Sequence, residues 1–455
     1  MIQKLSLSEK IGYGLGDMAA NFVFQAMLAL QLSFYTDTFG LTPAQAGTLF
    51  LVVGLCAAVL NPVMGAIADR TNTRWGKFRP YLLWTAVPFG IMGVLTFTTP
   101  NLSAGSKIIY AYVTYALLRI VYTVNNVPYA SLTGVITGDP DERTSIASWR
   151  QIFANSAGFI VQSLAVPMIA WSGHGNSAKG YQLTMGLFSV IGGVLFIVAF
   201  ASTKERIQPD PKQKSSLGQD LADLVGNGPW IALFLATMFY FIAIVMRSSV
   251  MLPFFKYAAH DQNLFSWFNG FGLASLLVGV AVSSKLSARF GKRSLFITSM
   301  VLTGILAAVL FVLPTQGTTL IFASEILRQF AFGCSCPVLW AMMGDVADYG
   351  EWKTGRRATG TVTSAVVFAL WLGLALGGAI AGWLFQAYGY VPNATQTAHS
   401  LAGILLVASV YSGLAFFATA VCLIFYPITR AKNREIADEL AERRLKFAPQ
   451  ETPGA

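Results

Sequence analysis

The side chains most capable of chemistry in this sequence are charged groups placed inside long apolar segments. Six of them stand out: Asp17, Arg119, Arg150, Arg247, Glu325 and Arg328. A charged side chain at membrane depth is costly, so it is expected to face a cavity or a partner of opposite charge. Because the four arginines outnumber the two carboxylates, an anionic ligand could balance part of this charge. Alternatively, Arg119 and Arg328 could bond to backbone carbonyls or to Glu325 and never face a cavity.

Uncharged polar side chains lie on the same helical faces as these charges. Asp17, Asn21 and Gln25 recur at every fourth residue, and the segment 119–126 similarly places an arginine, a threonine and an asparagine on one face. Amide and hydroxyl groups both donate and accept hydrogen bonds, as recognition of a small molecule with many hydroxyls requires. Asn, Ser and Thr can equally serve packing between membrane helices.

The composition indicates which elements must hold these residues. Of 455 residues, 55% are hydrophobic and 11% are charged, whereas an average soluble domain has about 25% charged residues. The sequence therefore predicts an all-α integral membrane protein, with helices of about 20 residues that each cross the bilayer. Hydropathy predicts twelve of them, at 12–36, 43–68, 81–99, 107–137, 145–172, 181–202, 229–255, 262–288, 293–313, 318–347, 358–387 and 400–427.

The longest polar break lies near the middle of the chain and separates six predicted helices from six. We expect an N-terminal six-helix bundle over 1–202, a cytoplasmic linker over 203–228, a C-terminal six-helix bundle over 229–427 and a cytoplasmic tail over 428–455. Within the linker, 216–225 is expected to form an amphipathic helix along the membrane surface. The tail is expected to form a short amphipathic helix over 430–447, or else to be a solvated terminus.

Basic residues indicate the orientation of the chain. With the N-terminus inside, only Lys107, Lys179 and Lys256 fall in outward-facing loops, although the chain has 31 Lys and Arg residues. This asymmetry predicts that both termini are cytoplasmic. It also accounts for the net charge of +10, which in a soluble protein would suggest binding to nucleic acid. Similar basic turns, Gly76-Lys77 and Gly291-Lys292, join the second and third helices of each half, and repeated halves around a central site are typical of secondary transporters.

Other classes of protein find little support in the sequence. The first ten residues lack the pattern of a cleavable signal peptide. The four cysteines and three histidines show no metal-binding spacing, so neither a metal site nor a cofactor is expected. Paired catalytic carboxylates and a nucleophile motif are not evident either, which argues against an enzyme.

Five short motifs are spread over nearly the whole chain. They are Gly12–Asp17, Tyr35–Asp37, Asp69–Pro80, Asn126–Tyr129 and Asp345–Glu351. Together they resemble motifs of the glycoside–pentoside–hexuronide:cation symporters, a family within the major facilitator superfamily, and the loop Asp69–Pro80 resembles the signature loop of that family. The resemblance implies two six-helix bundles, a central sugar site and alternating access from the two sides of the membrane.

The resemblance, together with the polar faces described above, implies a set of substrate-binding residues contributed by both halves. Arg150 matches an arginine that the family carries on the fifth helix. Aromatic rings in the set could stack on the apolar face of a sugar. We interpret as substrate-binding the residues Asn21, Gln25, Arg119, Tyr122, Thr123, Asn126, Trp149, Arg150, Arg247, Arg328 and Trp371.

Departures from the family pattern mainly concern the coupling cation. Sodium-coupled members carry two aspartates on the second helix, and the matching positions here are Ala57 and Asn61. Without carboxylates to compensate the charge of Na⁺, the usual sodium site is expected to be lost. The sugar-binding aspartates of the family correspond to Asn21 and Asn126, and a lysine of its eleventh helix corresponds to Trp371. Asparagine can still bind hydroxyl groups, because its amide both donates and accepts.

Charged residues at the cytoplasmic ends of the two halves are predicted to form a gate. Opposite charges could pair across the halves when this side is closed. Each exposed pair contributes about 1 kcal/mol or less, but several together can bias a two-state equilibrium. The same residues could instead serve only as topology signals and helix caps. The predicted gate residues are Asp69, Arg70, Arg74, Lys77, Arg79, Asp345, Asp348, Glu351 and Arg357.

The sequence therefore predicts a multi-pass transporter of the inner membrane that moves a sugar or glycoside, with an acidic sugar such as a hexuronide favoured. Proton coupling would need a titratable group, for which Asp17 and Glu325 are candidates, whereas facilitated diffusion needs none. The expected partners are the sugar, H⁺ if transport is coupled, and the lipid bilayer. Nucleic acid is not expected, and the chain is expected to act as a monomer. The alternatives are a sugar sensor that has lost transport and a lysolipid carrier of the same fold.

Overall fold

The computed structural model describes residues 5–137, 140–206, 227–315, 317–354 and 359–447, and within these ranges it contains helices and no β-strand. Eleven helical segments are long and apolar enough to cross a membrane, which confirms the all-α membrane fold. The predicted third span is occupied by α3 (Arg79–Thr96). This helix is not among the eleven, because its eighteen residues begin with Arg79, Pro80 and Tyr81.

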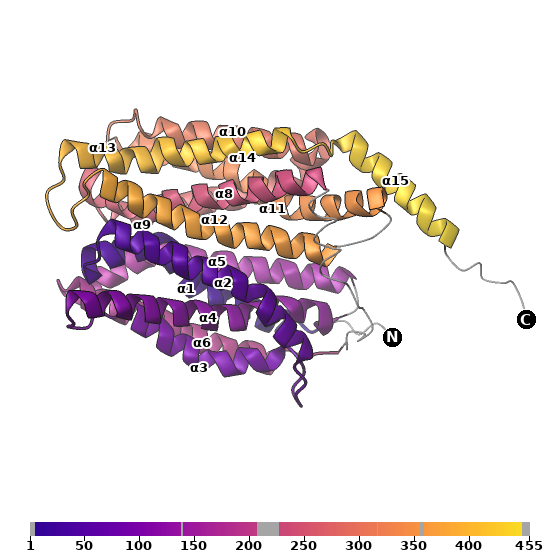
Figure 1. The fold of residues 1–455 in the computed structure, drawn as a ribbon, viewed down its shortest axis with the longest axis horizontal. Helices are drawn as coiled ribbons and strands as arrows, with labels where there is room; N and C mark the ends of the chain where they lie inside the picture. The colour runs from indigo at the N-terminus through magenta and orange to yellow at the C-terminus, as the bar shows by residue number, and fades with distance from the viewer. Residues whose placement is uncertain (1–4, 138–139, 207–226, 316, 355–358, 448–455) are drawn as a thin grey trace, which may run out of the picture.

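The first half of the chain forms helices that pack against one another in the lower part of Figure 1. They are α1 (Leu7–Ser33), α2 (Pro43–Arg70), α3, α4 (Ala104–Ile136), α5 (Pro140–Gly173) and α6 (Ser177–Ser202). α1 continues into η1 (Phe34–Phe39), a π-helical turn. Local signals define the helix starts: Ser6 caps α1 in a capping box, and Thr42 caps α2 ahead of Pro43.

The second half occupies the upper part of Figure 1. Its helices are α8 (Gly228–Pro253) with the π-helical turn η2 (Phe254–Ala258), α9 (Leu264–Phe290), α10 (Lys292–Val309), α11 (Thr318–Thr354) and α12 (Thr359–Ala387), followed by α13 (Ala398–Leu406), η3 (Val407–Tyr411) and α14 (Ser412–Ile424). The last three follow one another without a break and lie at the predicted twelfth span.

The predicted tail helix is present as α15 (Arg430–Phe447). Its apolar residues Ile436 and Leu440 are buried, and Glu439 accepts a hydrogen bond from the indole of Trp352 on α11 at 2.6 Å. The helix predicted at 216–225 lies outside the described residues.

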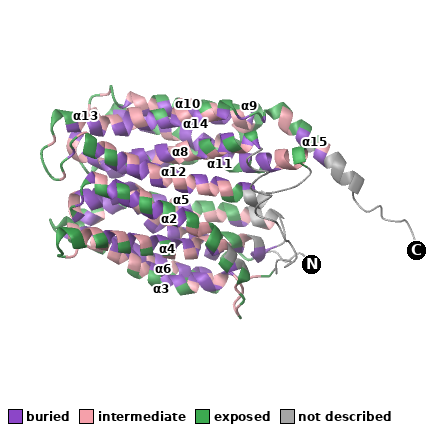
Figure 2. Cartoon of the chain, viewed as in Figure 1, coloured by how far each residue is buried: buried purple, intermediate pink, exposed green. Residues whose placement is uncertain are grey.

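The bundle has two ends, which the termini and the loops between helices distinguish. We call the end where α1 begins and α15 lies the near end, and the opposite end, with η1, η2 and the loop before α13, the far end (Figure 1). If the predicted orientation holds, the near end is cytoplasmic. Exposed residues follow the far-end loops and the outward sides of the helices (Figure 2). Large apolar side chains such as Ile109, Trp171 and Val190 are among them, as expected of a surface that faces lipid rather than water.

At the far end the two halves approach each other closely through α2 and α12. A Cβ atom added to Gly47 would lie 2.7 Å from the carbonyl oxygen of Ala379, and one added to Gly382 would lie 2.4 Å from that of Pro43. Only glycine permits this backbone approach. The far end is therefore closed in this structure.

Candidate functional site

Three aromatic rings connect the two halves in the middle of the molecule. Phe24 of α1, Tyr122 of α4 and Trp371 of α12 lie with ring centroids 6.0–6.2 Å apart in each pair. We call these three residues the aromatic cluster. The structure thus brings together the predicted residues Tyr122 and Trp371 from opposite halves, and adds Phe24, which the sequence analysis did not select.

Arg119 lies directly against this cluster. Its guanidinium carbon is 4.4 Å from the centroid of the Trp371 ring and 5.8 Å from that of Tyr122, which is a cation–π arrangement. Arg119 is only 5% exposed, and its Nε atom has no hydrogen-bond partner within the described part of the chain. Among the described residues no carboxylate forms an ion pair with it. Arg119 is therefore a buried cation held by aromatic rings rather than by an anion.

The predicted amides line up along α1 and α4. The side-chain nitrogen of Asn21 donates to the backbone oxygen of Asp17 at 2.9 Å, and its oxygen accepts from Gln25 at 3.5 Å. Gln25 in turn accepts a hydrogen bond from Gln162 of α5 at 3.0 Å. Asn126 is half-buried and makes no hydrogen bond with the described residues, so its amide is free to bind a ligand.

Gln162 is a polar neighbour that the sequence analysis missed. It is a neutral side chain in a long apolar helix, and no spacing or charge distinguished it from residues that only pack between helices. Of the other predicted residues, Thr123 is buried on α4, and Trp149 stacks on Phe153 of its own helix with ring centroids 6.1 Å apart.

Asp17 and Arg150 form an ion pair towards the near end of the first half. Arg150 Nε donates to Asp17 Oδ2 at 3.1 Å, and the Arg150 side chain remains 37% exposed. Its guanidinium carbon lies 5.7 Å from the ring centroid of Tyr129, which stacks on Tyr13. Arg150 therefore has both a counter-charge and contact with solvent.

The remaining charged groups form a separate triad inside the second half. Glu325 of α11 accepts from Arg247 of α8 at 2.7 Å and from Arg328 Nε at 2.8 Å. All three residues are buried, and Arg247 also donates to the carbonyl of Ala408. The structure thus pairs Arg328 with Glu325, the arrangement considered as the alternative to a role in the cavity. It does not bring this triad to the aromatic cluster.

The described contacts of the predicted gate residues lie within single halves. Arg79 donates to the carbonyl of Phe200 at 2.7 Å, and the backbone nitrogens of residues 77–79 each donate to the carboxylate of Glu205 at 2.8 Å. Asp345 pairs with Lys292 of the same half at 2.6 Å. A gate that joins the two halves at the near end therefore stays a prediction.

The other gate residues add no described contact across the halves. Arg70 and Arg74 are exposed at the near end, Lys77 is half-buried, and Asp348 and Glu351, on the last turns of α11, each take part in an interaction. The side chain of Asp69 and the whole of Arg357 lie outside the described residues.

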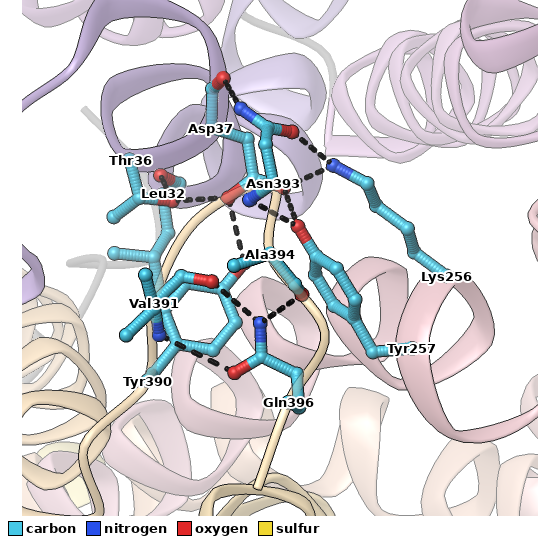
Figure 3. A network of polar contacts seen from close by, with 10 residues as sticks. All are labelled: Leu32, Thr36, Asp37, Lys256, Tyr257, Tyr390, Val391, Asn393, Ala394 and Gln396. Atoms are coloured by element: carbon cyan, nitrogen blue, oxygen red, sulfur yellow. Dashed lines mark hydrogen bonds and ion pairs between the residues drawn. The ribbon is translucent and has the colours of Figure 1, made fainter.

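A cluster of polar contacts joins the two halves at the far end (Figure 3). Asp37 of η1 accepts hydrogen bonds from Lys256 of η2 at 2.5 Å, from the Tyr257 hydroxyl at 2.9 Å and from the Tyr390 hydroxyl at 2.6 Å. Asn393 bonds to the backbone oxygen of Asp37 and accepts from Lys256. We call Asp37, Lys256, Tyr257, Tyr390 and Asn393 the far-end cluster.

The far-end cluster was not predicted, although Asp37 belongs to one of the five motifs. A signal was present in the sequence: η1 and η2 end the first helix of each half, and they carry charges of opposite sign. Burial and the neighbouring Asp37 raise the pKa of the Tyr390 phenol above its ordinary value. Tyr390 therefore remains a hydrogen-bond donor throughout the neutral pH range.

Comparison of the sequence with known proteins identifies the family to which this chain belongs. The chain matches the MFS/sugar transport proteins over residues 12–430. It belongs to this family. It is 40% identical over 442 residues to the glycoside/cation symporter candidate YagG of Escherichia coli K12, covering 97% of this chain and 96% of that protein. It is 32% identical over 450 residues to the glucuronide carrier protein homolog of the same organism, covering 98% and 97%.

A solved structure agrees with this assignment at the level of the fold. The crystal structure of a D-xylose–proton symporter superimposes with a TM-score of 0.68 and 16% sequence identity, over 92% of this chain and 97% of that one. The predicted major facilitator fold and the resemblance to the glycoside–pentoside–hexuronide symporters are thus confirmed. This member of the MFS/sugar transport family is a multi-pass inner-membrane transporter and not an enzyme.

Proposed function

We propose that this transporter carries a glycoside or sugar by alternating access and binds it between Asn21, Asn126 and the aromatic cluster. The observation that carries the proposal is the amide of Asn126, which makes no hydrogen bond with the described residues. It lies one helical turn from Tyr122, whose ring contacts Trp371 of the other half. An amide can pair with sugar hydroxyls as donor and acceptor. An aromatic ring can cover the apolar face of the sugar. Because both halves contribute, movement of one half against the other would open and close the site.

We further propose that transport is independent of Na⁺. Ala57 and Asn61 occupy the positions of the family's cation-binding aspartates, and the Asn61 amide donates to the backbone oxygen of Ala57 at 3.0 Å. The pair offers no carboxylate to a cation. Transport would then be driven by H⁺ or follow the gradient of the sugar alone. Of the two titratable candidates, Asp17 fits better than Glu325, because its partner Arg150 is partly exposed whereas both partners of Glu325 are buried.

The charges favour an acidic sugar such as a hexuronide over a neutral glycoside. Arg150, Arg247 and Arg328 each have a carboxylate partner, which leaves Arg119 as the arginine at the aromatic cluster whose charge the described residues do not balance. The similarity to a glucuronide carrier protein homolog supports the same preference.

Uptake into proteoliposomes tests this function. Radiolabelled glucosides, xylosides and glucuronides are supplied with an imposed Na⁺ gradient, an imposed H⁺ gradient or neither, with choline as the replacement cation. We expect uptake of at least one glycoside, at the same rate in choline as in sodium. Stimulation by Na⁺ of several-fold would contradict the proposed loss of the sodium site. Saturable binding without uptake of any glycoside would instead favour a sugar sensor.

A further inference from the structure

A small cavity separates the aromatic cluster from the closed far end. Its volume is about 50 Å³, and it is lined by residues of α1, α2, α4, α8 and α12. Most of these residues are apolar, but Gln31, Tyr115, Arg119 and Ser249 contribute polar groups. The cavity therefore lies between the two halves, on the far-end side of the proposed sugar site.

Two buried donors on the cavity wall lack acceptors. Arg119 Nε and Gln31 Nε2 have no hydrogen-bond partner among the described residues, although these two side chains belong to residues that are only 5% and 3% exposed. The Ser249 hydroxyl, by contrast, donates to the carbonyl of Val245 in its own helix at 2.7 Å. A buried donor without an acceptor is unfavourable, and more so when it is charged. The wall includes a cation and no carboxylate, so its chemistry is complementary to an anion.

We propose that this cavity is an anion-binding subsite, in which Arg119 and Gln31 hold either the acid group of the substrate or a small inorganic anion. In its substrate form the inference rests on the proposed function, because the acid group would belong to a glycoside bound beside the aromatic cluster. Arg119 suits this role. Trp371 covers a face of its guanidinium, which leaves the N–H groups at the edge for a carboxylate or sulfonate.

The size of the cavity limits what can enter. One water needs about 10–15 Å³ of such volume, so about 50 Å³ accommodates an acid group or a small ion. A sugar ring would not fit. The ring would remain at Asn126 and the aromatic cluster while only its acid group reaches past Trp371.

Thermal unfolding of the purified protein, followed at constant ionic strength, tests the subsite with three probes: methyl β-D-glucuronide, methyl β-D-glucoside and sodium bromide. We expect the glucuronide to bind at least about tenfold more tightly than the glucoside, because charge-assisted hydrogen bonds to its acid group are stronger than those between neutral groups. Arg119→Gln should abolish this preference, because it weakens binding of the glucuronide more than binding of the glucoside. Gln31→Leu should reduce it in part, and Arg289→Gln, at an exposed arginine, should leave it intact.

The measurements with bromide distinguish an acid group of the substrate from a free inorganic anion as the occupant of the subsite. If bromide stabilises the wild type but not Arg119→Gln, and the two glycosides bind equally, the subsite holds a free anion. If neither glycoside binds and bromide still acts through Arg119, the subsite stands while the sugar proposal fails. The inference is overturned if no probe gives an effect that depends on Arg119 or Gln31. If Arg119→Gln does not fold, two other variants test the inference. Arg119→Lys keeps the charge but loses the planar guanidinium, and Gln31→Leu removes the second donor.

Discussion

Glu325 is a single carboxylate that compensates two buried arginines, one on its own helix and one on α8. Removing one partner from a buried ionic group typically costs about 3–5 kcal/mol. We therefore expect Glu325→Gln to lower the free energy of unfolding by this amount. Asp17→Asn should cost clearly less, because water can solvate the partly exposed Arg150. Thermal unfolding in one detergent compares the two variants.

A different outcome would assign Glu325 a role in coupling rather than in stability. If Glu325→Gln unfolds at the wild-type temperature yet no longer accumulates substrate against its gradient, Glu325 is the coupling group. Asp17→Asn would then retain accumulation. If Asp17→Asn instead loses accumulation but retains exchange, the coupling function belongs to Asp17.

Asn126 is the single residue on which the proposed sugar site most depends. We expect Asn126→Ala to weaken binding of the transported glycoside by about 1–3 kcal/mol, the usual loss when a buried hydrogen-bonded group of the ligand is left without its partner. Calorimetry on correctly inserted protein measures this directly. Asn101→Ala, at an exposed loop position, is the matched control. Wild-type affinity in Asn126→Ala would reject this site.

The sequence revealed which charged residues lie in apolar segments. It indicated only some of the contacts that these residues make in the folded protein. Arg328 follows Glu325 by three residues, so their contact on one helical face was foreseeable. Arg247 lies 78 residues from Glu325, and nothing in the sequence indicated that α8 would bring it there. Arg119 could not be distinguished from the other arginines by sequence. Whether it lacks a carboxylate partner depends on where the fold places every carboxylate.

At the scale of elements, hydropathy predicted the helices well. A segment that crosses the bilayer must satisfy its backbone hydrogen bonds internally, as a helix does, and must present apolar side chains to lipid. The predicted span 43–68 corresponds to α2 (Pro43–Arg70), whose start is determined by Thr42 and Pro43. The π-helical turns η1 and η2 were not predicted, since they depend on tertiary contacts more than on composition. These turns carry Asp37 and Lys256, so the far-end cluster was missed together with them.

The contact of α2 with α12 yields a prediction at this scale. A valine at Gly47 would collide with the backbone at Ala379, and such overpacking typically costs about 1–3 kcal/mol. Because the contact joins the halves at the far end, we expect Gly47→Val to disfavour closure there and to slow glycoside uptake about tenfold. Binding of the glycoside from the far side should be retained.

Gly105→Val is the matched control for this substitution. Gly105 also lies near the far end, but a Cβ atom there would have no neighbour within 4 Å. Its uptake rate should equal that of the wild type. Equal rates for Gly47→Val and the wild type would show that α2 and α12 tolerate a wider separation than the closed far end implies.

For the molecule as a whole, the far-end cluster should determine which side of the transporter is open. Asp37 accepts three hydrogen bonds from the second half, one of them from the ammonium group of Lys256. Because these bonds join the two halves, we expect them to break when the far end opens. Any free energy that they contribute therefore enters the equilibrium between the two access states directly.

We expect Asp37→Asn to shift this equilibrium towards an open far end by about 1–3 kcal/mol, the range for hydrogen bonds to charged groups. Lys256→Met should shift it less, because both tyrosine hydroxyls would still donate to Asp37. Lys179→Met, at an exposed lysine of the far end that lies outside the far-end cluster, should have no effect. After the native cysteines are replaced, new cysteines at Ser103 and Ala398, one on each half, carry spin labels. Electron–electron distance measurements between the two labels report the separation of the halves at the far end. Since the cluster is absent from the open state, Asp37→Asn should change the populations of the short and long distances without creating a new distance. A distribution identical to that of the wild type would mean that the packing of α2 against α12 closes the far end by itself.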